Sequence, residues 1–337
     1  MSQYKSASVR VFLFTYRRNN LLPRAIESLI NQSYSDWICE LHNDDPDDAF
    51  PRDLVKRYND PRILYKKHEK NLGGVRSFNL AFDEITEDYV SILEDDNWWE
   101  VDFLTTMIAE LNNNPNINIA WANMWLSHED KTGNWTREKT IWPYIENESN
   151  KIFITPHPQQ VCGCLHSNGA MLLRKNASPY LKIPPSLPFF IIEPVRERGF
   201  FGPLLLVTKP LANFAITNET ARKETADENM KMLVILAMTF FSFASVDKTF
   251  YKETWKATRG SLGHKHRALL VAAILSKRSL DIISAAHIGD IIIVLAWAFR
   301  HPIRFKNLFS AEKTHPEIYN YLSAATASLA QEWRKNF

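Results

Sequence analysis

Short apolar runs alternate with helical patterns along the first hundred residues. The apolar runs are residues 9–15, 37–42, 62–67 and 88–94, and their length and composition are typical of buried strands. Residues 19–33 and 73–85 instead space their apolar side chains as helices do, the first with an Asn as its expected N-cap and Pro23 in its first turn. Strands that alternate with helices predict an α/β fold, with a mostly parallel sheet that helices flank on both faces.

The second half of the chain changes its pattern twice. Residues 117–127 and 131–142 have the pattern of two strands joined by a glycine-containing turn. From about residue 226 to the end the apolar spacing is helical, most clearly in residues 227–246. We therefore predict a domain of residues 1–225 followed by a helical C-terminal region of residues 226–337.

Polar residues follow three of the predicted strands. They are Thr15, Tyr16 and Arg17 after the first strand, Asn43, Asp44 and Asp45 after the second, and Glu94, Asp95 and Asp96 after the fourth. Because ligands of parallel sheets bind beyond the carboxyl ends of the strands, we expect these residues at one edge of the sheet. Two acidic clusters there would repel each other, which favours a divalent cation, Mg²⁺ or Mn²⁺, together with a phosphorylated ligand. The alternative is that the aspartates only cap the helices that follow them.

The overall composition gives no sign of a strong global electrostatic field. Forty basic and thirty-eight acidic residues leave a net charge of +2, so the charge balance predicts no nucleic acid partner. Three cysteines at irregular spacing do not suggest a disulfide framework, and the first residues contain no apolar signal segment. We expect a protein of the cytoplasm.

One C-terminal segment predicts a contact with a membrane. Residues 282–305 are apolar for most of a bilayer-spanning length, but His287 and Asp290 interrupt them. Basic residues flank the segment on both sides, namely Lys277, Arg278, Arg300, Arg304 and Lys306. This combination favours a helix that lies in the plane of an anionic membrane, peripherally on the inner face. The alternative is a helix buried in a C-terminal bundle.

Four short motifs occur in a characteristic order within residues 8–215. They are the opening strand with the turn TYRRN, the stretch NDDPDD, the helix start NLGGVRSFNLA, and LEDDN. In this order the chain resembles family 2 glycosyltransferases of the GT-A fold, which are inverting enzymes that use nucleotide sugars. By this resemblance, residues 8–100 form the nucleotide-sugar half of the domain and residues 115–225 form the acceptor half. Two positions depart from the family pattern, because Asn43 replaces an Asp and Glu94 replaces the first acid of an Asp-x-Asp motif.

The resemblance also implies roles for single residues. It places Thr15, Tyr16 and Arg17 beside the donor nucleotide, Asp44 as the acceptor for uracil N3–H, Arg76 at a phosphate, and Asp95 near the ribose or the donor sugar. It implies that Asp96 binds the metal ion, Mg²⁺ or Mn²⁺, that bridges the two donor phosphates. For Arg76, an ordinary solvated side chain on a helix is the alternative.

A carboxylate that takes the proton of the acceptor hydroxyl is needed for inversion. The family places this acid shortly before a Glu-Arg-Gly turn, which is residues 197–199 here, but this chain has Leu187 and Pro188 at the expected positions. Glu193 is the nearest carboxylate and is our expected catalytic base. Four acids further along the chain are alternatives, namely Glu219, Glu224, Asp227 and Glu228.

The resemblance therefore implies an enzyme that moves a hexosyl or N-acetylhexosaminyl group from a nucleoside-diphosphate donor, with UDP as the expected nucleotide. The expected acceptor is a glycan or a lipid-linked glycan. One alternative is a catalytically inactive nucleotide-sugar-binding protein of the same fold, which the missing acids at Leu187 and Pro188 would suit. Another is a nucleotidyltransferase, although the turn TYRRNN lacks the glycine-rich loop of that class.

Overall fold

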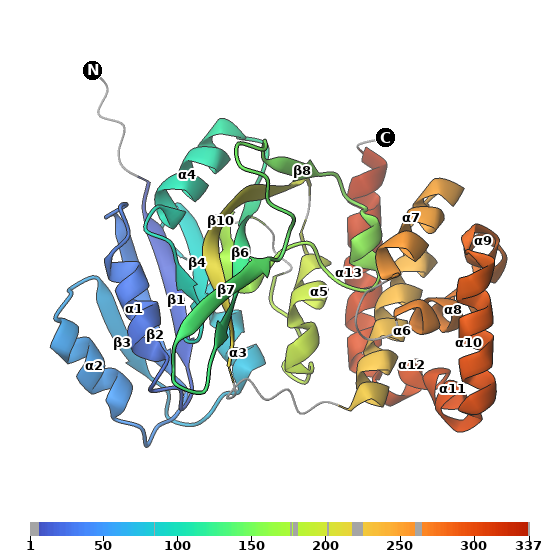
Figure 1. The fold of residues 1–337 in the computed structure, drawn as a ribbon, viewed down its shortest axis with the longest axis horizontal. Helices are drawn as coiled ribbons and strands as arrows, with labels where there is room; N and C mark the ends of the chain where they lie inside the picture. The colour runs from blue at the N-terminus through green and yellow to red at the C-terminus, as the bar shows by residue number, and fades with distance from the viewer. Residues whose placement is uncertain are drawn as a thin grey trace. The chain divides into compact units, whose positions relative to one another are not determined.

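The computed structural model describes residues 7–83, 85–175, 177, 181–200, 202–217, 225–259 and 265–335. Its chain forms two compact units, and Figure 1 labels their α-helices and most of their strands. The first unit combines Met1–Phe153, His166–Ala177 and Pro203–Ala221. The second combines Ile154–Leu165, Ser178–Gly202 and Arg222–Phe337.

A ten-stranded sheet forms the centre of the first unit. Its strands are β1 (Val9–Thr15), β2 (Trp37–Asn43), β3 (Ile63–Lys67), β4 (Tyr89–Glu94), β5 (Trp98–Trp99), β6 (Ile119–Glu129), β7 (Trp135–Thr140), β8 (Lys151–Phe153), β9 (Met171–Arg174) and β10 (Leu204–Ile216). They follow the order β3-β2-β1-β4-β9-β6-β10-β5, with β7 on β6 and β8 on β10. The strands from β3 to β4 are parallel, as are β6 and β10, whereas β9 is antiparallel to both neighbours. The predicted α/β fold with a mostly parallel sheet is confirmed.

Helices flank this sheet because each carries one apolar face. They are α1 (Leu22–Ile30), α2 (Phe50–Tyr58), α3 (Gly74–Asn79) and α4 (Phe103–Asn113), with the 3₁₀ turns η1 (Leu80–Phe82) and η3 (Asn168–Ala170). The buried residues of α1 are spaced three and four apart, which brings Ile26 and Leu29 into the same core cluster as Phe103 of α4. Burial of such side chains against the sheet stabilises each helix far more than its own propensity does.

Two helix ends differ from the prediction. The N-cap of α1 is Leu21 instead of an Asn, and no side chain caps the helix, although the proline lies in the first turn as expected. The helix predicted over residues 73–85 ends at Asn79 and continues as η1 only to Phe82. The reason is that the backbone becomes extended at Asp83, with φ −77° and ψ 172°, which no helix can continue.

The register of the sheet aligns the carboxyl ends of three strands. β1 pairs with β2 so that Thr15 lies opposite Asn43, and it pairs with β4 so that Phe14 lies opposite Glu94. Parallel strands in this register finish at the same level. The residues that follow β1, β2 and β4 therefore leave the sheet side by side at one edge.

The described part of the second unit is helical. Its helices are α5 (Ile192–Glu197), α6 (Ala226–Phe243), α7 (Lys248–Thr258), α8 (Lys265–Leu275), α9 (Ser279–Ala285), α10 (Ile288–Arg300), α11 (Pro302–Leu308), α12 (Ala311–Thr314) and α13 (Pro316–Lys335), with the 3₁₀ turns η2 (Pro158–Val161) and η4 (Phe189–Ile191). α6 is buried around its circumference. The Arg198 guanidinium lies over its Phe240 ring at 4.7 Å and donates to Gln160 O at 2.6 Å. The predicted helical C-terminal region is confirmed.

None of the described helices is by itself long and apolar enough to cross a membrane. α9 and α10 meet that criterion only as a pair, and they are bent by 120° at the break between them. α10 has 13 residues, which corresponds to a length of about 20 Å. The hydrocarbon core of a bilayer is thicker, at about 30 Å.

Candidate functional site

The strand ends of β1, β2 and β4 meet as their register requires. Tyr16 N donates to Asp95 Oδ2 at 3.4 Å, and Asp44 N donates to Thr15 O at 3.0 Å. Thr15, Asp44 and Asp95 are buried, whereas the Tyr16 ring is 43% exposed. Four of the residues that the sequence suggested for a donor site therefore lie together at one edge of the sheet.

Two buried carboxylates at this edge converge on one positive group. Arg18 Nη1 donates to Asp95 Oδ1 at 3.1 Å and to Asp96 Oδ2 at 2.5 Å, and Arg24 Nη2 donates to the backbone oxygen of Asp96 at 2.8 Å. Burial raises the pKa of Asp95 to about 7, against the lowering effect of Arg18, and the charge of Asp96 raises it further. The two carboxylates thus require a cation between them, which Arg18 supplies in this structure.

The same pair of carboxylates fits a divalent metal ion. Mg²⁺ and Mn²⁺ take oxygen ligands and commonly use one or two protein carboxylates, with phosphate and water in the other positions. Asp95 and Asp96 present oxygen atoms toward a common cation position. Neither aspartate caps the next helix, since the N-cap of α4 is Asp102. These observations favour ligand binding over capping for this pair.

Asp44 is held by three donors that come from β3 and the start of α3. Its Oδ1 accepts from Leu72 N at 2.7 Å and faces His68 Nδ1 at 2.9 Å, and its Oδ2 accepts from Gly73 N at 3.0 Å. Gly73 has φ +79°, which favours glycine at this turn. A carboxylate has about four acceptor positions, so Asp44 retains one for a further N–H donor.

A chain of hydrogen-bonding groups runs behind Asp44. His42 Nε2 faces Glu40 Oε2 at 3.2 Å, His42 Nδ1 faces His68 Nε2 at 3.0 Å, and His68 Nδ1 faces Asp44 Oδ1 at 2.9 Å. Burial lowers the pKa of His42 to about 4, and His68 lowers it further while Glu40 opposes the shift. The chain links Asp44 to Glu40 through the two imidazoles and holds His68 beside Asp44.

Glu94, the first acid of the LEDDN motif, lies in a tightly packed network. Its Oε2 accepts from Asn97 Nδ2 at 2.5 Å, and Asn97 Oδ1 accepts from Ala215 N at 2.9 Å. A Cβ added to Gly169 would lie 2.6 Å from Glu94 Oε2, which is closer than real Cβ contacts allow. Gly169 O also accepts from Trp99 Nε1 at 2.7 Å. A side chain at residue 169 would therefore force the Glu94 and Asn97 side chains to move.

The remaining two candidate donor-binding residues lie at the rim. Arg17 has φ +56° and its Nε donates to Asp45 Oδ2 at 2.5 Å. Arg76 is exposed on α3 and makes no hydrogen bond or ion pair with the other described residues. The proposed phosphate contact of Arg76 therefore stays a prediction.

Glu193, Asp227 and Glu228 belong to the second unit. Glu193 lies in the first turn of α5 and is partly buried. Nearby Glu197 is buried and accepts from Gln160 Nε2 at 2.9 Å and from Leu165 N at 2.9 Å. Of the four alternative acids, Asp227 and Glu228 lie on α6, where Glu228 pairs with Lys231 and His315. Glu219 and Glu224 lie outside the described residues. Glu193 as the catalytic base stays a prediction.

The sequence analysis did not single out Arg18, His42, His68 or Gly169. Arg18 is the second arginine of the turn TYRRN. A basic residue in a turn that is expected beside two acidic strand ends was the signal in the sequence for a pairing with these acids. His42 and Glu40 alternate along β2 and therefore share one face. No local pattern points to Gly169, since its contact with Glu94 joins residues far apart in the chain.

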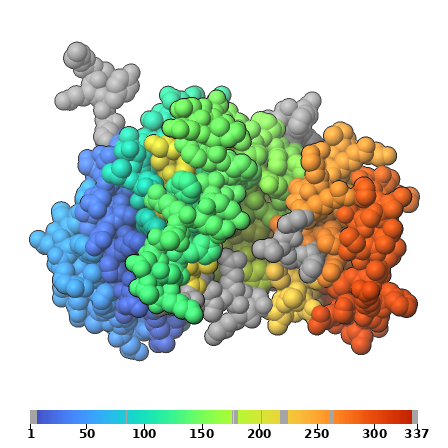
Figure 2. Space-filling model, viewed as in Figure 1, coloured from blue at the N-terminus to red at the C-terminus, as the bar shows by residue number. Residues whose placement is uncertain are grey.

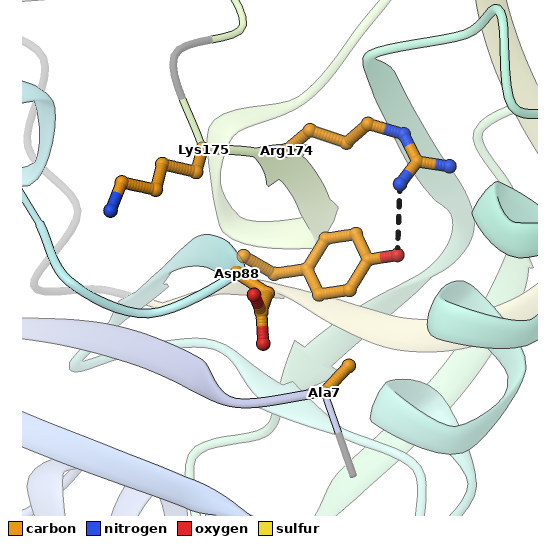
Figure 3. Close-up of a pocket in the computed structure, with 5 residues that line it drawn as sticks. Ala7, Asp88, Arg174 and Lys175 are labelled. Carbon is orange, nitrogen blue, oxygen red and sulfur yellow. Dashed lines mark hydrogen bonds between the residues drawn. The ribbon is translucent and has the colours of Figure 1, made fainter. Parts of the chain in front are cut away.

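A cavity of about 440 Å³ lies at the opposite edge of the sheet. Ala7, Asp88, Tyr89, Arg174 and Lys175 line it (Figure 3). Its polar groups bind other parts of the protein. Arg174 donates to Tyr89 Oη at 3.1 Å and to Leu111 O at 2.6 Å, and Asp88 accepts from Ser8 N at 2.9 Å. The carboxyl-end edge, and not this cavity, is therefore the candidate functional site.

Comparisons with known proteins agree with this assignment. Residues 11–177 match the family described as Glycosyl transferase family 2. An uncharacterized glycosyltransferase of Methanocaldococcus jannaschii is 29% identical over 152 residues, which are 44% of this chain and 52% of the relative. Glycosyltransferase GlyA of Streptococcus pneumoniae is 28% identical over 105 residues, which are 31% of this chain and 15% of the relative. The chain thus spans about half the length, or less, of these curated relatives.

Solved structures show the same fold. The crystal structure of S. aureus TarS residues 1–349 in complex with UDP has a TM-score of 0.56 at 11% identity, over 98% of this chain and 92% of that chain. The complex of the same protein with UDP-GlcNAc has a TM-score of 0.57 at 10% identity with the same coverage. The likeness extends over nearly the whole chain, so the expected GT-A-type fold with a helical C-terminal region is confirmed.

Proposed function

Because the chain belongs to glycosyl transferase family 2 through residues 11–177, we propose that it is a glycosyltransferase that uses a nucleoside-diphosphate sugar as donor. One observation carries the proposal: Asp44 follows β2 and Asp95 and Asp96 follow β4, the two parallel neighbours of β1, and the three buried aspartates lie at one edge of the sheet. Ligands of parallel α/β sheets bind beyond this edge.

The nucleobase is proposed to bind at Asp44. This carboxylate is fixed by three donors and retains one acceptor position, which suits the imide N–H of uracil. The exposed Tyr16 ring and buried Thr15 stand next to it at the end of β1. UDP is therefore the nucleotide that the site supports best, and UDP-GlcNAc is the first donor to screen, since TarS has been crystallised with it.

The diphosphate is proposed to bind at Asp95 and Asp96 through Mg²⁺ or Mn²⁺. When bound, the metal ion offsets the charge that develops on the departing nucleoside diphosphate. Asp96 would hold the ion, and Asp95 would orient the ribose or the sugar. Arg18 pairs with both carboxylates and would donate to a phosphate oxygen of the bound donor. Arg76, exposed on α3, is a second phosphate donor in this proposal.

The transfer is proposed to proceed with inversion to a glycan or lipid-linked glycan acceptor. Glu193 takes the proton of the attacking hydroxyl, as this mechanism requires a carboxylate base. The support for Glu193 is its place a few residues before the Glu-Arg-Gly turn and its partial exposure, whereas Glu197 of that turn is buried.

Release of UDP from UDP-sugars, measured with and without glycan acceptors and Mn²⁺, tests the proposed activity. Glu193→Gln is expected to lower the turnover about 10²- to 10⁴-fold while UDP binding persists, and Asp96→Asn is expected to abolish both. UDP binding without turnover for any donor and acceptor would instead identify a nucleotide-sugar-binding protein. Pyrophosphate release from a nucleoside triphosphate would identify a nucleotidyltransferase.

A further inference from the structure

α10 is apolar on two opposite faces. Val294 and Trp297, three residues apart, are buried in the second unit with 0% and 8% exposure. The outer face consists of Ile288, Ile292, Leu295 and Phe299, which are 74%, 59%, 56% and 88% exposed. Their spacing of four, three and four residues places them in one stripe along the helix. A surface helix of a globular protein normally presents charged and polar residues on this side.

The flanking helices also carry exposed apolar residues. Leu280 of α9 is 85% exposed and Ile303 of α11 is 75% exposed. The orange-to-red part of Figure 2 shows the surface that these helices present in that view. Single exposed apolar residues are common, but a contiguous stripe of large ones marks a binding surface. We call these six residues the α10 apolar stripe.

The charges around the α10 apolar stripe are predominantly basic. Residues 277–306 contain five Lys or Arg and two Asp. Both acids are paired, Asp290 with Arg259 at 3.0 Å and Asp281 with Arg278 at 3.5 Å. Lys277, Arg300 and Lys306 have no ion-pair partner among the described residues, so their charges remain available to an external partner. Lys277 precedes α9, Arg300 is the last residue of α10 and Lys306 lies on α11, so basic residues stand on both sides of the apolar residues of α10 in the sequence.

The combination of large exposed apolar side chains with Lys and Arg residues indicates what the surface can bind. A helix with exposed Ile, Leu and Phe and flanking Lys and Arg lies in the interface of an anionic bilayer, with its apolar side chains among the acyl chains and its cations at the headgroups. α10 is too short to cross the hydrocarbon core, and the 120° bend to α9 prevents the two helices from forming one straight span. A parallel orientation to the membrane plane satisfies both limits.

We infer that the α10 apolar stripe, with Lys277, Arg300 and Lys306, is a docking surface for an anionic lipid bilayer, on which the protein is peripheral. For a cytoplasmic protein this bilayer is the inner face of the membrane, where anionic lipids give a negative surface potential. The inference does not depend on the proposed sugar transfer, because it uses only residues of α9, α10 and α11. A bilayer-docked enzyme would have direct access to a lipid-linked acceptor.

Vesicle flotation of the full chain tests the inference without any nucleotide. Vesicles of phosphatidylcholine alone are compared with vesicles that contain about 30% phosphatidylglycerol, at low salt and at about 0.5 M salt. The protein is expected to float with the anionic vesicles at low salt and to do so several-fold less with neutral vesicles or at high salt.

Two double variants with the same change of charge separate the stripe from general surface effects. Ile292→Glu with Phe299→Glu alters the stripe and is expected to lower the vesicle-bound fraction about tenfold or more. Val101→Glu with Ile145→Glu is the matched control, because these side chains are also exposed, at 55% and 66%, but belong to the first unit. Circular dichroism and urea midpoints verify that each variant folds.

Three results would overturn the inference. The first is wild-type protein that does not float with anionic vesicles. The second is equal loss of flotation in the stripe variant and the control variant. The third is a wild-type dimer that the stripe variant converts to a monomer while neither binds vesicles, which would assign the stripe to contact between two copies of the chain. None of these results depends on UDP binding or turnover.

Discussion

Replacing His68 with Leu tests how Asp44 is held for the nucleobase. The change removes the imidazole that faces Asp44 Oδ1 at 2.9 Å, while the Leu72 and Gly73 amides remain bound to the carboxylate. A hydrogen bond to a charged group contributes about 1.5–3 kcal/mol. If this energy keeps Asp44 in its binding orientation, UDP affinity should fall about ten- to one-hundred-fold.

Asp44 is the end of a longer chain of polar groups. His68 Nε2 faces His42 Nδ1 at 3.0 Å, and His42 Nε2 faces Glu40 Oε2 at 3.2 Å. Glu40 is in turn bound by Arg10 at 2.6 Å. His68→Leu interrupts this chain at the residue that contacts Asp44.

Calorimetric titration of UDP at constant Mn²⁺ and constant pH measures this effect. His68→Asn is the control, because its amide retains a donor near the Nδ1 position, so its UDP affinity should stay near that of the wild type. Full UDP affinity in His68→Leu would refute the assignment of Asp44 orientation to His68.

Three further changes probe the rest of the site. Gly169→Ala places a Cβ 2.6 Å from Glu94 Oε2, so it should destabilise the protein by about 1–3 kcal/mol and impair UDP binding, whereas Gly133→Ala in the open β6–β7 turn should leave UDP binding intact. Burial and the neighbouring imidazole hold the pKa of His42 at about 4, so the folded state binds fewer protons than the unfolded chain between that value and about 6.5. Above about pH 6.5 His42 should therefore not lower the free energy of unfolding. As the pH drops from about 6.5 toward 4, the free energy of unfolding of the wild type should fall by up to about 3 kcal/mol more than that of His42→Gln. Urea denaturation at each pH measures this difference. Arg18→Ala leaves two buried carboxylates without their cation, so it should lower the free energy of unfolding by about 3 kcal/mol, and Mn²⁺ should raise its melting temperature more than that of the wild type.

The sequence predicted the sheet and its acidic edge because both follow from local rules. The bounds predicted for β1 agree with the structure. The reason is that a short, mostly apolar run that ends in polar residues is typical of a buried strand. The convergence of Asp44 and Asp95 follows from the parallel order of the strands, because such strands finish at one edge.

The chain behind Asp44 and the role of Arg18 depend on tertiary geometry that no local pattern contains. Adjacent Arg17 and Arg18 are alike in sequence, but the positive φ of Arg17 turns it to Asp45 and leaves Arg18 for the two buried carboxylates. His68 follows β3 and reaches Asp44 only through the register of β3 with β2. The catalytic base stays a prediction for a similar reason, because the connector before α5 has no periodic pattern that singles out one acid.

Calorimetric titration of UDP into wild-type protein and Asp96→Asn, each with Mn²⁺ and with a chelator, tests the central claim most directly. The proposed site predicts binding by the wild type that depends on Mn²⁺ and is lost in Asp96→Asn. Arg24→Ala removes a contact to the backbone oxygen of Asp96 and the guanidinium contacts with the rings of Trp98 and Trp135, but it leaves both carboxylates in place. It serves as the control and should retain metal-dependent binding. Failure of the wild type to bind UDP under every condition, or equal binding by wild type and Asp96→Asn with Mn²⁺, would contradict a metal-diphosphate site at the carboxyl ends of β1, β2 and β4.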